Sequence, residues 1–145
     1  MKISTKGRYA VRMLLDIAMH QKNEMISLRD IAERQQISKK YLEQIAAQLT
    51  QAGILTASRG QSGGYRLVGQ PSDYTLDRIL SVTEGRMHPV ACLDTSPNQC
   101  ARCDFCMTLP VWQRLDEVIH NYLASVTLQD ILDNYKARSI DNYSI

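Results

Sequence analysis

Hydrophobic side chains recur at every third or fourth position in three successive stretches of the first fifty residues. This spacing places them along one face of a helix and predicts helices at residues 5–21, directly after Ser27, and at residues 39–51. Ser4 precedes the first helix, and Ser27 and Ser38 are the predicted N-caps of the second and third. The second and third helices, joined by a short turn, have the arrangement of a helix-turn-helix.

Two short β-prone segments follow the third helix, at residues 54–57 and 65–68, with a polar, glycine-rich tip between them. This pattern predicts a β-hairpin with a long loop. A helix-turn-helix followed by a hairpin predicts a winged helix, which places a DNA-binding region at residues 1–70. The less specific alternatives are a helical hairpin with a solvated polar face and an ordinary surface hairpin.

The third predicted helix has an outward face of mixed polar character. Once the apolar positions are turned to the core, the solvent face holds Lys39, Lys40, Glu43, Gln44, Ala47 and Gln48. Glutamine and glutamate can hydrogen-bond base edges in the major groove, whereas lysine mainly contacts phosphate. In the hairpin tip, glycine allows close approach to a phosphate backbone, and Arg59 suits the negative potential of a narrow minor groove.

A long helical pattern begins near residue 110. Its apolar positions step by three or four residues through Trp112, Leu115, Ile119, Tyr122 and Val126. This heptad-like seam predicts a helix at residues 110–124 that packs against a partner, most simply its own copy in a homodimer. The alternative is that Trp112 and Tyr122 are buried in the core of the same chain.

The remaining segments complete the predicted organisation. Thr75 caps a helix that ends at Gly85, and Thr127 caps a last helix followed by a loosely ordered tail to Ile145. After residue 70 the chain is thus divided into three parts. Residues 71–91 form a connecting helix and linker, residues 92–107 a cysteine-rich cluster-binding loop, and residues 108–145 a dimerisation helix with a C-terminal helix and tail. The predicted fold class is mainly α with a small β-hairpin wing, a winged helix-turn-helix domain plus a long dimerisation helix.

Charge separates the two halves of the 145-residue chain. Residues 1–70 carry 11 Lys and Arg against 5 Asp and Glu, and residues 71–145 carry 6 against 10. A basic half beside an acidic half is typical of a nucleic-acid-binding region joined to a regulatory or oligomerising one. The sequence shows neither a signal peptide nor an apolar run of membrane-spanning length, so a cytoplasmic protein without a membrane partner is expected.

All four cysteines, Cys92, Cys100, Cys103 and Cys106, lie within one polar stretch, "CLDTSPNQCARCDFC". A disulfide framework is disfavoured in a reducing compartment. An iron–sulfur cluster, a structural zinc ion and a metal-free thiol switch all remain open, because the spacing matches part of a ferredoxin run and also contains CxxC units. The surrounding residues are too polar to fold alone, so we expect a bound cofactor to order the loop. His88 and His120 are expected to be solvated or packed rather than metal ligands.

Four stretches resemble one regulator family: "MKISTKGRYAVRMLLDIA", "SLRDIAERQQISKKYLEQI", "GILTASRGQSGGYRLV" and the cysteine loop followed by Trp112. They are similar to the winged-helix repressors that include IscR, NsrR and CymR. The resemblance implies a dimeric transcription regulator, not an enzyme, that binds a pseudo-palindromic operator of double-stranded DNA and exchanges cofactor with cluster-assembly proteins. The DNA-contacting residues that it implies are Ser38, Lys40, Tyr41, Glu43, Gln44, Arg59, Gly63, Gly64 and Tyr65. Lys39 is added to this set because it lies on the outward face at the start of the third helix.

The same resemblance implies a metal-ligand set. Cys92, Cys100 and Cys106 match the three family cysteines, with a 2Fe-2S cluster favoured and 4Fe-4S as the other type. The usual fourth ligands are replaced by Leu109 and Arg8, so our hypothesis is that Cys103 fills that position unless water or a partner group does. The alternative function is a CymR-like repressor of cysteine metabolism whose loop binds zinc or acts as a thiol switch.

Overall fold

The N-terminal half forms a winged helix. The computed structural model describes residues 1–143 and orders this half as α1 (Thr5–His20), α2 (Leu28–Gln35), α3 (Lys39–Gln51), β1 (Leu55–Ser58) and β2 (Gly64–Leu67). The three predicted helices are confirmed, and each begins at the expected serine. The hydroxyls of Ser4, Ser27 and Ser38 accept hydrogen bonds from backbone N–H groups in the first turns of their helices.

The two strands form an antiparallel hairpin, the wing, whose register pairs Leu55 with Leu67. The ladder lies one residue nearer the hairpin tip than predicted, and its register is the one that the predicted segments 54–57 and 65–68 would have. A third segment joins the hairpin, because Ile26 and Tyr65 exchange backbone hydrogen bonds of 2.9 and 2.8 Å. A side chain at Gly64 would place its Cβ 2.3 Å from the carbonyl oxygen of Ile26. Glycine is therefore required at this position by the close approach of the two backbones.

The main core forms where α1 meets α3. Met13, Leu14 and Ile17 of α1 are fully buried against an apolar side of α3 that includes Leu42 and Ile45. These positions follow the three-and-four spacing in the sequence, so the helical periodicity and the core have the same origin. The core fixes the orientation of α3 and leaves its polar face outward.

One charged group lies within this core. The Asp16 carboxylate is only 1% exposed and accepts three hydrogen bonds from the Arg34 guanidinium at 2.7–3.2 Å and one from the Gln35 amide at 2.9 Å. These bonds offset the desolvation of the carboxylate and join α1 to α2. In return, the hydrogen bond to Asp16 raises the pKa of Arg34.

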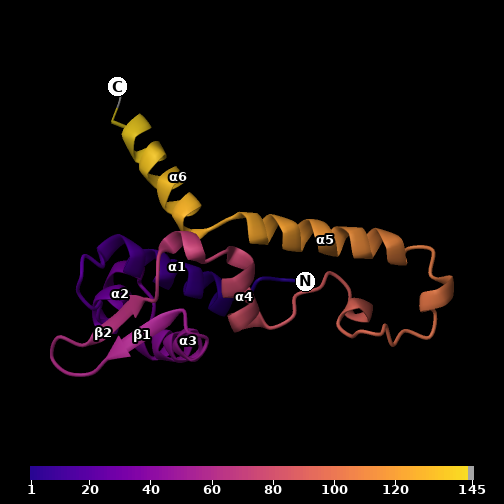
Figure 1. The fold of residues 1–145 in the computed structure, drawn as a ribbon, viewed down its shortest axis with the longest axis horizontal. Helices are drawn as coiled ribbons and strands as arrows, with labels where there is room; N and C mark the ends of the chain where they lie inside the picture. Colours follow the sequence, from indigo (N-terminus) through magenta and orange to yellow (C-terminus); the bar gives the residue numbers. More distant parts are fainter. Residues whose placement is uncertain (144–145) are drawn as a thin grey trace.

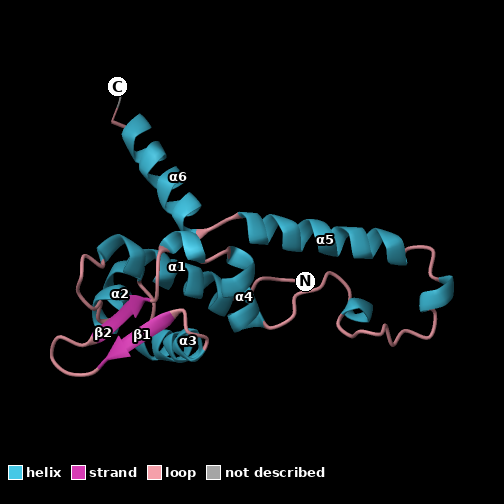
Figure 2. Cartoon of the chain, in the orientation of Figure 1, coloured by secondary structure: helices cyan, strands magenta, loops and turns pink. Residues whose placement is uncertain are grey.

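The C-terminal half is built from α4 (Leu76–Glu84), α5 (Leu109–Ser125) and α6 (Leu128–Asp141), with short 3-10 turns at Pro71–Asp73 (η1), Ala91–Leu93 (η2) and Cys103–Phe105 (η3) (Figure 2). Thr75 and Thr127 cap α4 and α6 as predicted. The predicted loose tail is wrong over its first part, because α6 continues to Asp141; Ser144 and Ile145 lie outside the described residues. Figure 1 shows α5 extending away from the winged helix and the cysteine loop returning beside it.

The C-terminal half of α5 is fixed to the winged helix. Ile119 and Leu123 pack with Leu80 and Met87 in a second, smaller core cluster. A main-chain bridge between Thr75 and Thr127 then leads directly into α6. The long helix is thus held at its C-terminal end, near the DNA-binding half.

The apolar positions of α5 divide between two faces. Ile119 faces α4, whereas an exposed stripe consists of Val111, Leu115, Val118 and Tyr122, which are 41–66% exposed. The predicted seam combined members of both faces, because its three-and-four steps follow either one. Tyr122 is not buried in the core of its own chain, so for this residue the alternative of internal burial is wrong.

Candidate nucleic-acid interface and metal-ligating residues

The N-terminal end of α3 presents the polar face predicted from the sequence. Lys39, Lys40, Glu43 and Gln44 are exposed, and the Lys39 ammonium lies 3.9 Å from the Glu43 carboxylate one turn later. Gln48 departs from the prediction, because its amide oxygen is buried and has no hydrogen-bond partner among the described residues. The exposed charged and amide side chains of the predicted face therefore lie in the first two turns, which are the part of a recognition helix that reaches base edges.

Tyr41 holds α3 against α1. Its ring meets the Tyr9 ring edge-on, with 5.7 Å between centroids, and the Arg12 guanidinium lies 5.2 Å from the centroid of Tyr9. Arg12 also donates to the Gln35 side chain and main-chain carbonyl. Tyr41, expected near phosphate from the family resemblance, is thus also a packing residue that orients the helix.

A groove of about 530 Å³ separates the wing from the start of α2 and α3. Three cationic side chains, Arg29, Lys39 and Arg59, line it together with Glu43 and the wing glycines. The sequence pattern did not single out Arg29, which stands in the first turn of α2, two residues after the Ser27 N-cap. The N-terminal ends of two helices and three cations give this groove a positive potential suited to phosphate.

The predicted wing residues fall into two groups. Arg59 is exposed near the tip, where it can reach beyond the body of the protein. Tyr65 is partly buried against the main core and pairs with Ile26, and Gly64 permits that pairing. The second group therefore positions the wing, while Arg59 remains available for contact.

The cysteines lie on consecutive turns at the far side of the molecule from the wing (Figure 1). The Cys103 N–H donates to the Cys100 carbonyl at 3.1 Å, and the Cys106 N–H donates to the Cys103 carbonyl at 3.4 Å. Each bond closes a turn between one cysteine and the next along the chain. Cys92 comes from the separate turn η2, and all four thiols are free.

Neighbouring side chains distinguish the thiols chemically. A hydrogen bond with the Thr108 hydroxyl at 3.4 Å lowers the pKa of Cys106. Desolvation, followed by the adjacent Asp104 carboxylate, raises the pKa of Cys103. Cys106 is therefore more readily ionised than Cys103, and the thiolate is the form that binds metals.

The donor set fits a sulfur-bound cofactor. Residues 92–107 supply four thiols and no member of either core cluster, and Phe105 and Met107 are 87% and 95% exposed. One tetrahedral zinc ion, with Zn–S bonds of about 2.3 Å, requires all four sulfurs within about 3.8 Å of one another. Within residues 1–143, however, no three cysteine sulfurs lie within 4.8 Å. The thiols are thus not preassembled as a tetrahedral zinc site, and any cofactor would have to draw them together.

The replaced family ligands also have defined places. Leu109 is the first residue of α5, three residues after Cys106, and offers no donor atom. Arg8 lies on the exposed side of α1, where its guanidinium donates to the Thr5 hydroxyl at 3.2 Å. Neither side chain offers a donor that replaces the family's fourth ligand, so the hypothesis that Cys103 fills this position stays a prediction.

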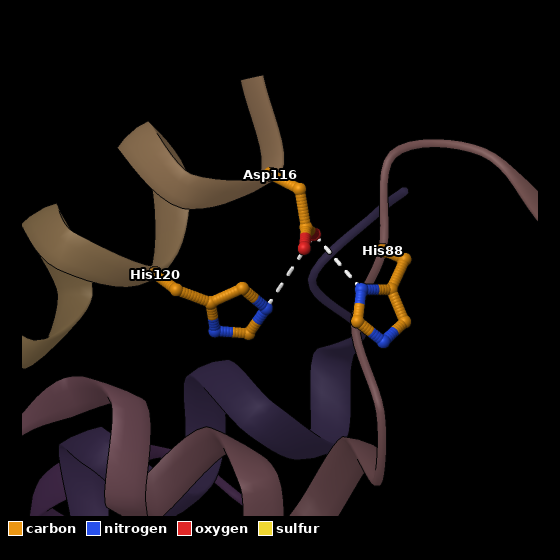
Figure 3. Close-up of side chains that lie close together, drawn as sticks. All are labelled: His88, Asp116 and His120. Carbon is orange, nitrogen blue, oxygen red and sulfur yellow. Dashed lines mark hydrogen bonds and ion pairs between the residues drawn. The ribbon is translucent and has the colours of Figure 1, made fainter. Parts of the chain in front are cut away.

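A second group of metal-binding side chains lies at the base of the cysteine loop. His88 and His120 flank Asp116 (Figure 3), with the Asp116 carboxylate 2.8 Å from His88 Nδ1 and 3.6 Å from His120 Nε2. Both histidines are thus packed against other side chains, which is one of the two expected environments, but their grouping with Asp116 was not predicted. The sequence signal was the spacing of Asp116 and His120, four residues apart on one helix, which places both side chains on the same face.

His120 makes two further polar contacts, one through each ring nitrogen. Its Nδ1 lies 2.8 Å from the Asp77 carboxylate of α4, and its Nε2 lies 3.0 Å from the Met87 carbonyl. The hydrogen bond to Asp77 raises the pKa of His120, although burial acts in the opposite direction. The imidazole thus joins α5 to α4 and to the segment that leads into the loop.

Comparison with known families gives one match across most of the chain. Residues 3–134 match the Rrf2 family, described as iron-dependent transcriptional regulators. Protein rrf2 of Nitratidesulfovibrio vulgaris is 38% identical over 132 residues, covering 91% of this chain and 87% of that protein. The HTH-type transcriptional regulator IscR of Vibrio atlanticus is 33% identical over 142 residues, covering 98% and 81% of the two chains.

Solved structures agree with this match. The structure of CymR, the global cysteine regulator of B. subtilis, superposes with a TM-score of 0.75 at 34% identity, covering 92% of this chain and 98% of that one. The structure of T. potens IscR gives a TM-score of 0.75 at 37% identity, covering 93% and 88%. In addition, none of the helices in residues 1–143 combines the length and apolar character needed to cross a bilayer.

Proposed function

Because this chain belongs to the Rrf2 family of transcriptional regulators, we propose that it is a dimeric, cytoplasmic repressor whose operator binding depends on an iron–sulfur cluster held by its cysteine loop. The protein is not an enzyme. The proposal rests chiefly on one observation: a chain with an exposed recognition face on α3 also carries four free thiols on a loop that contributes nothing to either described core cluster.

Cys92, Cys100 and Cys106 would hold the cluster, and Cys103 would supply the fourth thiolate. When bound, the cluster supplies a centre that responds to iron, oxidants or nitric oxide. The protein's part is to ionise its thiols, helped at Cys106 by Thr108, and to become ordered around them. Since α5 begins three residues after Cys106, ordering the loop also fixes the start of that helix.

On the DNA side, Gln44 and Glu43 would read base edges, while Lys40 and the groove cations would contact phosphates. Two copies related by the exposed stripe of α5 would present two α3 helices to successive major grooves. A regulator built in this way reads a pseudo-palindromic operator. Cofactor and DNA are then linked, so each alters the affinity of the protein for the other.

The proposal is tested on protein reconstituted anaerobically with iron and sulfide. We expect a brown protein that contains acid-labile sulfide, and different affinities of the loaded and cofactor-free forms for an operator duplex from its own promoter, measured by fluorescence anisotropy. Equal affinity of the two forms would contradict the sensing role. Failure to bind any duplex more tightly than random DNA would contradict the regulator role.

Single substitutions locate the ligands. Cys106→Ser and Cys103→Ser should each lower the bound iron and sulfide, whereas Met107→Ser, which changes a 95% exposed neighbour without a thiol, should leave them unchanged. If Cys103→Ser binds iron and sulfide normally, Cys103 is not the fourth ligand of the cluster, and water or a partner group takes that place.

A second candidate is a cysteine-metabolism repressor whose loop binds zinc or acts as a thiol switch. The superposition on B. subtilis CymR favours it. Colourless protein with one zinc ion per chain would support this candidate, as would metal-free protein whose DNA affinity changes on reversible thiol oxidation.

A further inference from the structure

Three potential metal ligands converge where the cysteine loop leaves the body of the protein. One ligand atom each from His88, Asp116 and His120 lies within 4.8 Å of the other two. Figure 3 shows the Asp116 carboxylate between the two imidazoles, one on the segment after α4 and one on α5. At metal–ligand bonds of about 2.0–2.2 Å, ligand atoms around a tetrahedral ion lie about 3.3 Å apart. The observed separations of 2.8 and 3.6 Å lie on either side of that value.

The group also has the outer support found in metal sites. A histidine ligand normally donates its second ring nitrogen to a carboxylate, which fixes the orientation of the ring. Asp77 has this relation to His120, at 2.8 Å from Nδ1, and thereby holds Nε2 facing both the Met87 carbonyl at 3.0 Å and the Asp116 carboxylate at 3.6 Å. Asp77 belongs to α4 and Asp116 to α5, so the carboxylate that orients the ring and the carboxylate that would bind the ion come from different helices.

Charge and access both favour a cation. The site contains two carboxylates, Asp77 and Asp116, whose side chains are 35% and 21% exposed. A cavity of about 540 Å³ opens beside it and is lined by Asp77, His88 and His120 among others. The nearby Arg86 directs its guanidinium elsewhere, to the Asp94 carbonyl at 3.1 Å. A hydrated ion can therefore enter, and water can complete its coordination.

We propose that His88, Asp116 and His120 form a binding site for a divalent first-row transition-metal ion, with Asp77 as the residue that positions His120. Two imidazoles and one carboxylate suit zinc and its neighbours better than magnesium or calcium, which prefer oxygen ligands alone. On binding, the ion replaces the proton that His120 Nε2 shares with the Met87 carbonyl.

The position of the site indicates what the ion would do. His88 lies four residues before Cys92, and Asp116 lies ten residues after Cys106. An ion held by both closes the base of the cysteine loop and removes part of the chain entropy that ordering the loop must overcome. The site uses none of the four thiols, so this inference goes beyond the cluster and stands or falls separately.

The test uses the full chain with all four cysteines changed to serine. Among residues 1–143 this leaves His88, Asp116 and His120 as the group of three ligands close enough to hold an ion. Calorimetric titration with zinc chloride should give one ion per chain, and cobalt(II) should give a visible d–d spectrum without a thiolate charge-transfer band. His88→Ala and His120→Ala should each lower the zinc affinity by more than the roughly 10- to 100-fold loss expected for Asp77→Asn.

His20 provides the matched control. It is the one other histidine in the sequence, it lies on α1, and its Nδ1 is hydrogen-bonded to the Asp16 carbonyl rather than to this group. His20→Ala should leave the zinc affinity unchanged. Absence of saturable binding, or equal loss in His20→Ala and His120→Ala, would overturn the proposal. If circular dichroism shows that the serine chain does not fold, the cobalt(II) spectra of the wild-type chain and of its His88→Ala variant are compared instead. Loss of d–d bands in His88→Ala would support the site, and identical spectra would contradict it.

Discussion

At the scale of single residues, identical side chains a few positions apart have different chemistry. Cys103 and Cys106 belong to the same short turn, yet one thiol faces the Asp104 carboxylate and the other the Thr108 hydroxyl. A carboxylate repels a developing thiolate, whereas a hydroxyl can donate a hydrogen bond to it. The neighbouring residues thus rank the thiols before any cofactor arrives.

This ranking predicts alkylation rates in reduced, cofactor-free protein. Near neutral pH the thiolate is the reacting form, so the lower pKa of Cys106 gives it the larger reactive fraction. We therefore expect iodoacetamide to modify Cys106 roughly several-fold faster than Cys103. Mass spectrometry of quenched time points measures the two rates. Thr108→Val should slow Cys106 and leave Cys92 as it was; an unchanged Cys106 rate would show that the hydroxyl has no such effect.

At the scale of elements, α3 combines two functions on opposite sides. Its buried side, with Leu42, Ile45 and Leu49, fixes the helix to the core, and this rigidity holds Gln44 in one place on the exposed side. A base-reading side chain discriminates only if its donor and acceptor positions are fixed relative to the duplex. The core of the winged helix is therefore also a condition for sequence preference.

This division predicts opposite consequences for two neighbouring substitutions. Gln44→Ala should reduce discrimination between operator and altered operator by about 1–3 kcal/mol, because it removes a base contact. Lys40→Ala should weaken binding to all sequences alike and reduce the salt slope by about one, because it removes a phosphate contact. Fluorescence anisotropy over a range of salt concentrations measures both effects.

The matched control on the same helix is Gln51→Ala, at the exposed C-terminal end of α3. It should change neither quantity. Equal losses on operator and random DNA for Gln44→Ala would refute the base-reading assignment.

The elements also show how far the sequence could predict the structure. The first three helices, the serine and threonine caps and the start of the recognition face follow from contacts within a few residues, so the sequence predicted them closely. The pairing of Ile26 with Tyr65 was not predicted, because the two residues are far apart in the sequence. The histidine group was not predicted for the same reason: His88 and Asp116 come from separate segments that only tertiary packing brings to 2.8 Å. The position of the cysteine sulfurs could not be predicted, since the loop has no apolar periodicity.

At the scale of the whole molecule, the exposed stripe of α5 is the largest feature without an explanation inside a single chain. Val111, Leu115, Val118 and Tyr122 step by four, three and four residues, the repeat of a two-stranded coiled coil. The stripe faces away from the second core cluster, which already holds Ile119 and Leu123. We therefore expect it to be covered by a second copy of the chain.

The dimer is tested by Leu115→Asp, which places a charge at the middle of the stripe. A carboxylate buried in an apolar interface without a partner is strongly unfavourable, so the variant should be monomeric, as measured by sedimentation or light scattering. Gln113→Asp adds the same charge to an exposed polar position of α5 and should remain dimeric. A wild-type monomer at micromolar concentration, or an unaffected Leu115→Asp dimer, would contradict the arrangement.

The main-chain bridge between Thr75 and Thr127 holds the C-terminal end of α5, so a change in the tilt of the helix pivots about that end. The 17 residues of this helix span about 25 Å, so a tilt of about 5° there moves the cysteine-bearing tip by about 2 Å. Conversely, a displacement of the tip by about 2 Å corresponds to a rotation of only about 5° at the winged helix. If two copies pair through the exposed stripe of α5, such a rotation would change the angle between their two α3 helices.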